Sequence, residues 1–98
     1  MTINKTKNGS ALTVALEGRL DTITAPELET ALKAEYEGIE TLTFDFEKLE
    51  YISSAGLRVL LSAQKIMNNK GGMKVTKVNE LVNEVFEVTG FADILTIE

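Results

Sequence analysis

Cysteine and histidine are both absent from this 98-residue chain, and so is tryptophan. Without cysteine the chain can form no disulfide and offers no thiolate, which fits a reducing compartment such as the cytoplasm. Without histidine it lacks the commonest general base and the commonest transition-metal ligand. From these absences we expect that the chain binds no cofactor and no metal. They also favour a protein that is recognised by other proteins over an enzyme.

Long apolar runs are missing as well. No segment approaches the roughly 20 apolar residues that cross a bilayer, and residues 1–10 lack the apolar core of a signal peptide. We therefore expect a cytoplasmic protein with no membrane partner. The phosphate-binding patterns G-x-x-x-x-G-K and G-x-G-x-x-G are also absent.

Positive charge is scarce relative to negative charge. The chain has 10 Lys and Arg against 15 Asp and Glu, which gives a net charge of −5. Because binding to a nucleic-acid backbone needs clustered Lys and Arg, we expect no direct contact with nucleic acid.

What is present is a series of strand and helix signals, within a length that suits one domain. Asn8-Gly9 predicts a type I′ turn between two strands. The second strand alternates apolar and polar residues from Leu12 to Leu16, and Gly18 is expected to end it.

Helices and further strands follow. The first helix has Thr24 as candidate N-cap, completed by Glu27 in a capping-box pattern, with Pro26 in its first turn. The last helix has Asn79 as candidate N-cap and ends at Gly90. The remaining patterns predict a strand at 39–49, a helix beginning in 53–57, a strand at 73–78 and a strand at 93–98. The inward stripe of the middle helix is predicted to hold Leu57, Leu60, Leu61, Gln64 and either Met67 or Ile66.

The resulting order is β-β-α-β-α-β-α-β. Helices between strands indicate crossover connections and parallel pairing, and the hairpin adds antiparallel pairing. We therefore predict an α/β fold: a mixed, mostly parallel sheet with an N-terminal antiparallel hairpin and with helices packed on the sheet.

Two carboxylates, Asp45 and Glu47, alternate with phenylalanines in the predicted central strand. Paired carboxylates can act as acid and base. A solvated strand face explains the same spacing more simply, and no histidine or metal-ligand spacing accompanies them. We interpret both as surface residues.

The stretch L-E-Y-I-S-S-A-G-L-R-V-L-L, residues 49–61, places two serines between a strand and a helix. Ligands and modifications gather at such junctions in α/β sheets, and a helix N-terminus with its free N–H groups accommodates a phosphate. Gly56 would let another protein approach the backbone, and Arg58 could reach back to a phosphate on Ser54. The alternative interpretation is that a serine only caps the helix.

Three segments resemble, in the same order, segments of one known family. Residues 16–32, L-E-G-R-L-D-T-I-T-A-P-E-L-E-T-A-L, are similar to a G-x-L-D-x-x-T-A segment, through Gly18, Leu20, Asp21, Thr24 and Ala25. Residues 49–61 are similar to a phosphorylation loop, D-S-[ST]-G-[LI], and residues 85–97 to a closing helix, glycine turn and strand. The whole of 1–98 thus resembles a single STAS domain, most closely the small anti-sigma factor antagonists of bacteria.

The resemblance implies that Ser54 is the phosphorylated residue. Ser53 stands where the family usually has Asp, and Ala55 where it usually has Ser or Thr. The first difference removes a negative charge and makes Ser53 a backup phosphate acceptor. The second removes a hydroxyl group, so the candidate acceptors are Ser53 and Ser54 alone. Asp21 matches a family acid that either contacts the loop or the partner, or caps the turn before the first helix. The implied partner-binding residues are Asp21, Ser53, Ala55, Gly56, Leu57 and Arg58.

The resemblance also implies partner switching. The dephosphorylated antagonist would bind an anti-sigma factor serine kinase of the GHKL type and so release a sigma factor. Phosphorylation of Ser54 would end that complex, and a PP2C-type phosphatase would reset it. The alternative is a STAS interaction module without switching, as a scaffold or transporter-associated subunit. A small enzyme or nucleotide binder is disfavoured by the missing histidine, cysteine and phosphate loop.

Overall fold

The computed structural model describes all 98 residues, in an order close to the predicted one. Its elements are β1 (Thr2–Asn8), β2 (Ala11–Leu20), α1 (Ala25–Lys33), β3 (Thr41–Ile52), α2 (Ser54–Met67), β4 (Met73–Thr76) and α3 (Glu80–Thr89). Two 3-10 turns, η1 (Tyr36–Gly38) and η2 (Phe91–Asp93), complete the chain. The sheet order is β1-β2-β3-β4, with β1 and β2 antiparallel and the other neighbours parallel. The predicted α/β fold with an antiparallel N-terminal hairpin is therefore confirmed.

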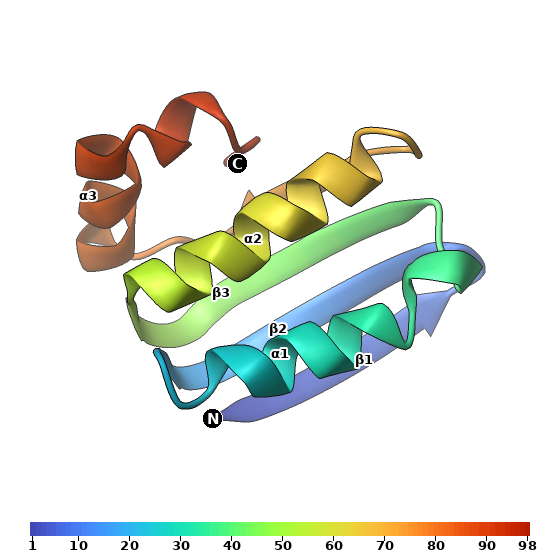
Figure 1. The fold of residues 1–98 in the computed structure, drawn as a ribbon, viewed down its shortest axis with the longest axis horizontal. Coiled ribbons are helices and arrows are strands. Elements are labelled where there is room, and N and C mark those ends of the chain that lie inside the picture. The colour runs from blue at the N-terminus through green and yellow to red at the C-terminus, as the bar shows by residue number, and fades with distance from the viewer.

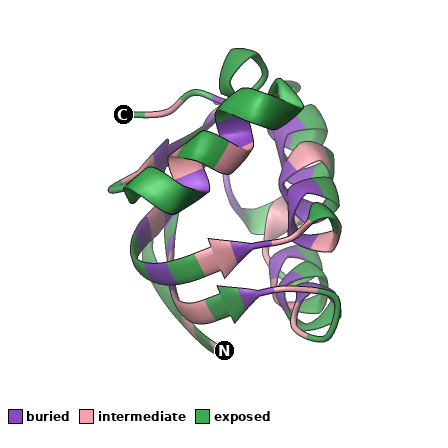
Figure 2. Cartoon of the chain, turned by 90° about the vertical axis from the view of Figure 1, so that its left-hand side faces the viewer, coloured by how far each residue is buried: buried purple, intermediate pink, exposed green.

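The helices cover one face of the sheet. Figure 1 shows α1 and α2 lying across it, with α3 set apart toward the C-terminus. In Figure 2 the helix sides that face the sheet are buried, and the outward sides are exposed. The opposite face of the sheet carries no helix, and exposed residues such as Thr13 and Glu47 lie there.

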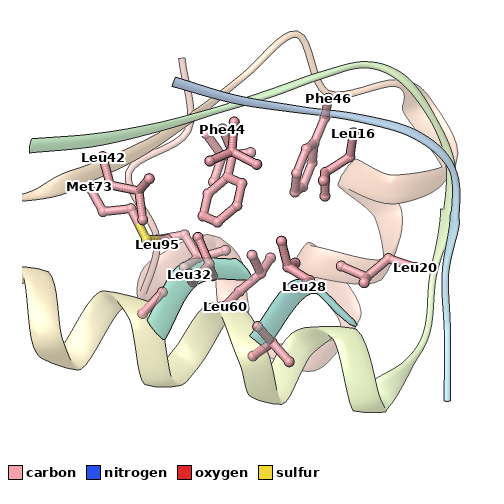
Figure 3. Packing of buried hydrophobic residues seen from close by; sticks show 14 of the residues in the cluster. Leu16, Leu20, Leu28, Leu32, Leu42, Phe44, Phe46, Leu60, Met73 and Leu95 are labelled. Carbon is pink, nitrogen blue, oxygen red and sulfur yellow. The ribbon is translucent and has the colours of Figure 1, made fainter. Parts of the chain in front are cut away.

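The core lies between the central strands and the helices. Alternate residues of β2 and β3 are buried, as a strand with one covered face requires. Figure 3 shows side chains of both strands pointing toward leucines of the helices. The phenyl rings of Phe46 and Phe86 lie 6.5 Å apart, so α3 joins the same core. Each fully buried side chain of this size stabilises the fold by roughly 1.5–3 kcal/mol.

β3 is longer at its C-terminal end than the predicted strand at 39–49. Its pairing with β2 shifts register twice, because β3 has an extra residue at each point. The buried positions consequently step by three residues, from Phe46 to Leu49 and then to Ile52. The alternation that marks a strand in a sequence ends at the first shift, although the strand itself continues to Ile52.

The hairpin turn and the end of β2 differ from the prediction. Asn8 pairs with Ala11, so the turn residues are Gly9 and Ser10. Gly9 has φ +64° and Ser10 has no positive φ, which is the type II′ pattern and not type I′. The expectation that Gly18 ends β2 is also wrong. The strand continues through Gly18, which has φ +102° at one of the register shifts.

The helix ends are partly as predicted. Asn79 Oδ1 accepts a hydrogen bond from Val82 N at 2.8 Å, which confirms the N-cap of α3, and Gly90 ends this helix in the left-handed conformation. Asn79 Nδ2 also donates to Leu49 O at 2.8 Å and so ties α3 to β3. The capping box of α1 is wrong, because Thr24 makes no side-chain cap hydrogen bond.

The middle helix and the C-terminal segment complete the comparison. In α2 Met67 is fully buried and Ile66 is 38% exposed, so Met67 belongs to the inward stripe. The predicted strand at 93–98 is reduced to a single parallel bridge between Val75 and Ile97. Two backbone hydrogen bonds, from Val75 N to Thr96 O and from Glu98 N to Val75 O, make up this bridge. Residues Phe91–Asp93 form η2 instead.

Candidate functional site

Two chain segments meet at the C-terminal ends of β2 and β3. Leu20 pairs with Ile52, and Ser53 N donates a hydrogen bond to Leu20 O at 2.9 Å. The turn after β2 and the start of α2 are therefore held side by side. This is the edge at which ligands and modifications gather in parallel sheets.

The two serines at this edge have different environments. Ser53 occupies the N-cap position of α2 with extended backbone (φ −101°, ψ 177°). Its Oγ is buried, makes no cap hydrogen bond and has no hydrogen-bond partner. Ser54, the first residue of α2, is exposed. Of the two candidate acceptors, only Ser54 presents its side chain to solvent.

The start of α2 has no side-chain cap. The first N–H groups of any α-helix lack intrahelical partners, and the helix dipole adds about half a positive charge there. Because Ser53 does not cap the helix, no side chain satisfies these donors. The exposed Ser54 thus lies within a field that favours an anion on its hydroxyl.

Gly56 and Leu57 are buried in the interior of the domain. A Cβ on Gly56 would lie 2.7 Å from Leu20 Cγ and 2.9 Å from Ile52 Cγ1, so the missing side chain lets α2 pack against both strands. Leu57 is 5% exposed. The interpretation that Gly56 gives another protein access to the backbone has no support in this geometry, since Gly56 is buried.

Asp21 organises the turn between β2 and α1. Its Oδ1 accepts hydrogen bonds from Thr24 N (3.1 Å), Ile23 N (3.0 Å) and Thr24 Oγ1 (3.2 Å). The backbone N–H of Thr24, together with the other donors and the charge of Arg19, holds the pKa of Asp21 below its ordinary value. The sequence alone left open whether Asp21 caps the turn before the first helix or contacts the loop or a partner. These hydrogen bonds show that it caps the turn.

A shallow hollow of about 220 Å³ lies between α1 and α2 beside the serines. Its lining includes Thr22, Pro26, Ala55, Arg58 and Val59. Arg58 is exposed and takes part in no ion pair, so its guanidinium is available to an anion one turn from Ser54. The apolar side chains that line the hollow therefore lie beside the predicted phosphorylation loop at Ser53 and Ser54.

Ile23 is the site residue that the sequence analysis missed. It follows Thr22 in the turn next to the hollow, and it is 82% exposed. A large apolar residue between two threonines in a polar turn is the signal that could have identified it. A single exposed apolar side chain is common on protein surfaces, and Ile23 is notable only because its turn adjoins the hollow lined by Pro26, Ala55 and Val59.

The carboxylates of β3 lie away from the serines. Asp45 and Glu47 both pair with Lys77, with N–O distances of 3.8 and 3.5 Å. Both carboxylates lie on the sheet face that no helix covers, as expected for surface residues.

The order of the elements and the mixed four-stranded sheet are those of a known domain family. The chain belongs to the STAS domain family, which matches residues 2–98. It is 34% identical over 99 residues to BtrV of Bordetella bronchiseptica, a protein assigned to the anti-sigma factor antagonists, with 99% of this chain and 85% of BtrV covered. It is 27% identical to the anti-sigma-B factor antagonist of Staphylococcus aureus, with 99% of this chain and 92% of that protein covered.

Solved structures share this fold. The unphosphorylated form of the anti-sigma factor antagonist SpoIIAA superimposes with a TM-score of 0.85 at 16% identity, covering 99% of this chain and 88% of SpoIIAA. The phosphorylated form of the Bacillus protein gives a TM-score of 0.77 at 15% identity, covering 99% and 91%. No helix of the chain is both long enough and apolar enough to span a membrane.

Proposed function

We propose that this chain is an anti-sigma factor antagonist that works by partner switching, with Ser54 as the phosphorylated residue. In this proposal the dephosphorylated chain binds an anti-sigma factor that is also a serine kinase of the GHKL type. Binding releases the sigma factor. The chain is then a regulatory protein of the cytoplasm and not an enzyme, and it contacts neither nucleic acid nor membrane directly.

The observation that carries the proposal is the contrast between the two serines. Ser54 is exposed at the uncapped start of a 14-residue helix, whereas the Oγ of Ser53 is buried. A kinase needs access to the hydroxyl oxygen, and this favours Ser54 over Ser53. Support of a second kind comes from the family, because the relatives are assigned to anti-sigma factor antagonists and SpoIIAA has a phosphorylated form.

The proposed chemistry is a phosphoryl transfer in which the kinase supplies ATP and the catalytic groups. Ser54 Oγ attacks the γ-phosphorus, a new O–P bond forms, and the bond from the γ-phosphorus to the bridging oxygen of ADP breaks. The hydroxyl proton passes to a base of the kinase. A PP2C-type phosphatase would later transfer the phosphoryl group to water and restore the hydroxyl.

The phosphate would act on the partner interface more than on the fold. It adds about −1.5 to −2 charges at neutral pH. The helix dipole of α2 and the free guanidinium of Arg58 favour that charge within the chain itself. Burying it against a partner without matching cations costs several kcal/mol, and each 1.4 kcal/mol weakens binding about tenfold.

The test is phosphorylation by a GHKL-type anti-sigma factor kinase that binds the chain. Mass spectrometry after incubation with ATP should give one phosphate on the wild type and on Ser53→Ala, and none on Ser54→Ala. Calorimetry should show binding of the kinase to the unphosphorylated chain and at least a hundredfold loss for the phosphorylated chain. Equal binding by both forms would refute the switch.

The second candidate function is a STAS interaction module that does not switch. The observation that favours it is the loop itself, where Ser53 and Ala55 replace the usual acidic and hydroxyl residues. Such a module would bind its partner through the same edge but would receive no phosphate. Tight binding to a partner without phosphorylation of Ser54 would support this candidate.

A further inference from the structure

Negative charge is concentrated at the C-terminal end of the chain. All 10 Lys and Arg lie within residues 1–77, together with 10 of the 15 Asp and Glu. The first 77 residues are therefore neutral. Residues 78–98 hold the other five acids and no base, so they account for the whole net charge of −5.

The outer side of α3 combines this charge with exposed apolar side chains. Leu81 and Val88 are 51% and 77% exposed, and the half-buried Val85 lies between them at helical spacing. Glutamates precede each of these residues by one position and form a parallel stripe, none of them in an ion pair. We call this surface the α3 face: Glu80, Leu81, Glu84, Val85, Glu87 and Val88.

The orientation of α3 is fixed by contacts on its other side. Val82 and Phe86 are fully buried, and Phe86 packs near Phe46 of β3. The Asn79 side chain caps the helix and donates to Leu49 O. The apolar residues of the α3 face are thus held outward while the core of the domain is already filled.

The charge of the α3 face restricts what can cover it. A second copy in a symmetric contact would oppose one glutamate stripe to another, and like charges across an interface are unfavourable. Nucleic acid and anionic lipid surfaces would be repelled for the same reason. A cationic surface with its own apolar stripe meets both requirements, since it pairs with the glutamates and covers Leu81 and Val88.

We propose that the α3 face docks a cationic amphipathic helix of a partner protein. Its apolar side chains lie against Leu81, Val85 and Val88, and its Lys or Arg side chains pair with the glutamate stripe. The contact would pack one helix against another, and the spacing of Leu81, Val85 and Val88 at i, i+4 and i+7 supplies the anchors. The contact does not involve Ser54, so it is independent of the proposed switch.

Three synthetic peptides of about 18 residues, each five helical turns, test the proposal. One has leucines on one face and lysines on the other, the second has the same leucines with glutamates, and the third has the same lysines with serines in place of leucines. Each is titrated into the isotope-labelled chain and followed by amide chemical shifts. The Leu-Lys peptide should give saturable shifts concentrated in residues 80–89. The Ser-Lys peptide should bind at least tenfold more weakly, and the Leu-Glu peptide should give no shifts.

Variants separate the two components of the α3 face. Glu84→Lys with Glu87→Lys, and separately Leu81→Ser with Val88→Ser, should each weaken Leu-Lys binding at least tenfold. The matched control is Glu37→Lys with Glu40→Lys, an equal charge change at two exposed acids outside the α3 face. The control should bind within twofold of the wild type, and Ser54→Asp should do the same. If the variant with Leu81→Ser and Val88→Ser fails to fold, the variant with Glu84→Lys and Glu87→Lys still tests the proposal.

Several outcomes would overturn the proposal. Shifts centred outside residues 80–89 would place the peptide on another surface. Equal binding of the Ser-Lys and Leu-Lys peptides, or equal weakening by the control pair, would show attraction by charge alone. If Ser54→Asp lost binding of the Leu-Lys peptide, the peptide would bind at the Ser54 surface and not at the α3 face. Self-association of the wild type in sedimentation velocity, abolished by Leu81→Ser with Val88→Ser, would make a second copy the occupant.

Discussion

Replacing Gly56 by alanine is the most direct test of how the loop is held. Gly56 lies in the first turn of α2, two residues after Ser54, and it is buried against Leu20 and Ile52. Both neighbours are themselves buried, at 0% and 1% exposure, and they belong to adjacent paired strands. The added methyl group therefore meets atoms that have little room to move.

The magnitude follows from the distances. The new Cβ would lie 2.7 Å from Leu20 Cγ and 2.9 Å from Ile52 Cγ1, about 1 Å closer than a favourable carbon–carbon contact. Overpacking of this kind costs typically 1–3 kcal/mol. The higher helix propensity of alanine offsets at most about 1 kcal/mol. We expect a net destabilisation of about 1–2 kcal/mol, or a Tm lowered by roughly 5–15 °C in a domain of this size.

Urea denaturation followed by circular dichroism measures the effect. The matched control is Gly38→Ala, where the Cβ would meet only the mobile end of Lys7, with Nζ at 2.9 Å. This control should shift the free energy of unfolding by less than about 0.5 kcal/mol. A Gly56→Ala variant as stable as the control would refute the argument that close packing demands glycine here.

Three further predictions concern the loops around the sheet. The folded-state pKa of Asp21 is below 3.8 because of the Thr24 N–H and the other donors. Its ionisation therefore stabilises the fold above pH 3.8, and this contribution is lost as pH falls through the lower folded pKa. Asp21→Asn should lower the urea midpoint at pH 6, with the difference from wild type shrinking as the pH falls through the lowered folded-state pKa of Asp21. Ser53→Ala should change the free energy of unfolding by less than about 0.5 kcal/mol, well below the usual loss for an N-cap, because Ser53 makes no cap bond. A loss of 1 kcal/mol or more would show that the hydroxyl caps α2 in solution. Lys77 has φ +58° and two exposed ion pairs, with Asp45 and Glu47. Lys77→Gly should therefore be at least as stable as Lys77→Met in thermal melts, since glycine relieves the strained φ and neither variant keeps the pairs.

Much of the fold could be predicted because its signals are local. The cap at Asn79 and the glycine after α3 act within a single turn, and the alternation from Leu12 to Leu16 reports one covered face directly. The end of β3 could not be predicted in the same way. Its register shifts arise from pairing with β2. Gly18 of β2 lies at one of them, but no residue type within β3 marks the extra residues that change the spacing of its buried positions.

The site was predictable as a location but not in its details. The sequence analysis placed the serines at the start of a helix, which the structure confirms. It could not tell which hydroxyl is accessible, because the direction of Ser53 depends on where β3 ends and how α2 packs. The packing role of Gly56 could not be predicted for the same reason, since its neighbours Leu20 and Ile52 come from two other elements. The exposure of Ile23 likewise depends on the turn that Asp21 holds.

The replacement of the usual acid by Ser53 bears on the proposed switch through capping. An aspartate at an N-cap commonly accepts hydrogen bonds from the first N–H groups of the helix and neutralises part of its dipole. Ser53 does neither, because its Oγ is buried without a partner. The donors at the start of α2 therefore stay available to a phosphate on Ser54, and the residue before Ser54 adds no carboxylate that would repel it. If Ser54 is the acceptor as proposed, we expect the serine at position 53 to leave the start of α2 able to accommodate a phosphate, and the lost acidic side chain to act on recognition by the kinase.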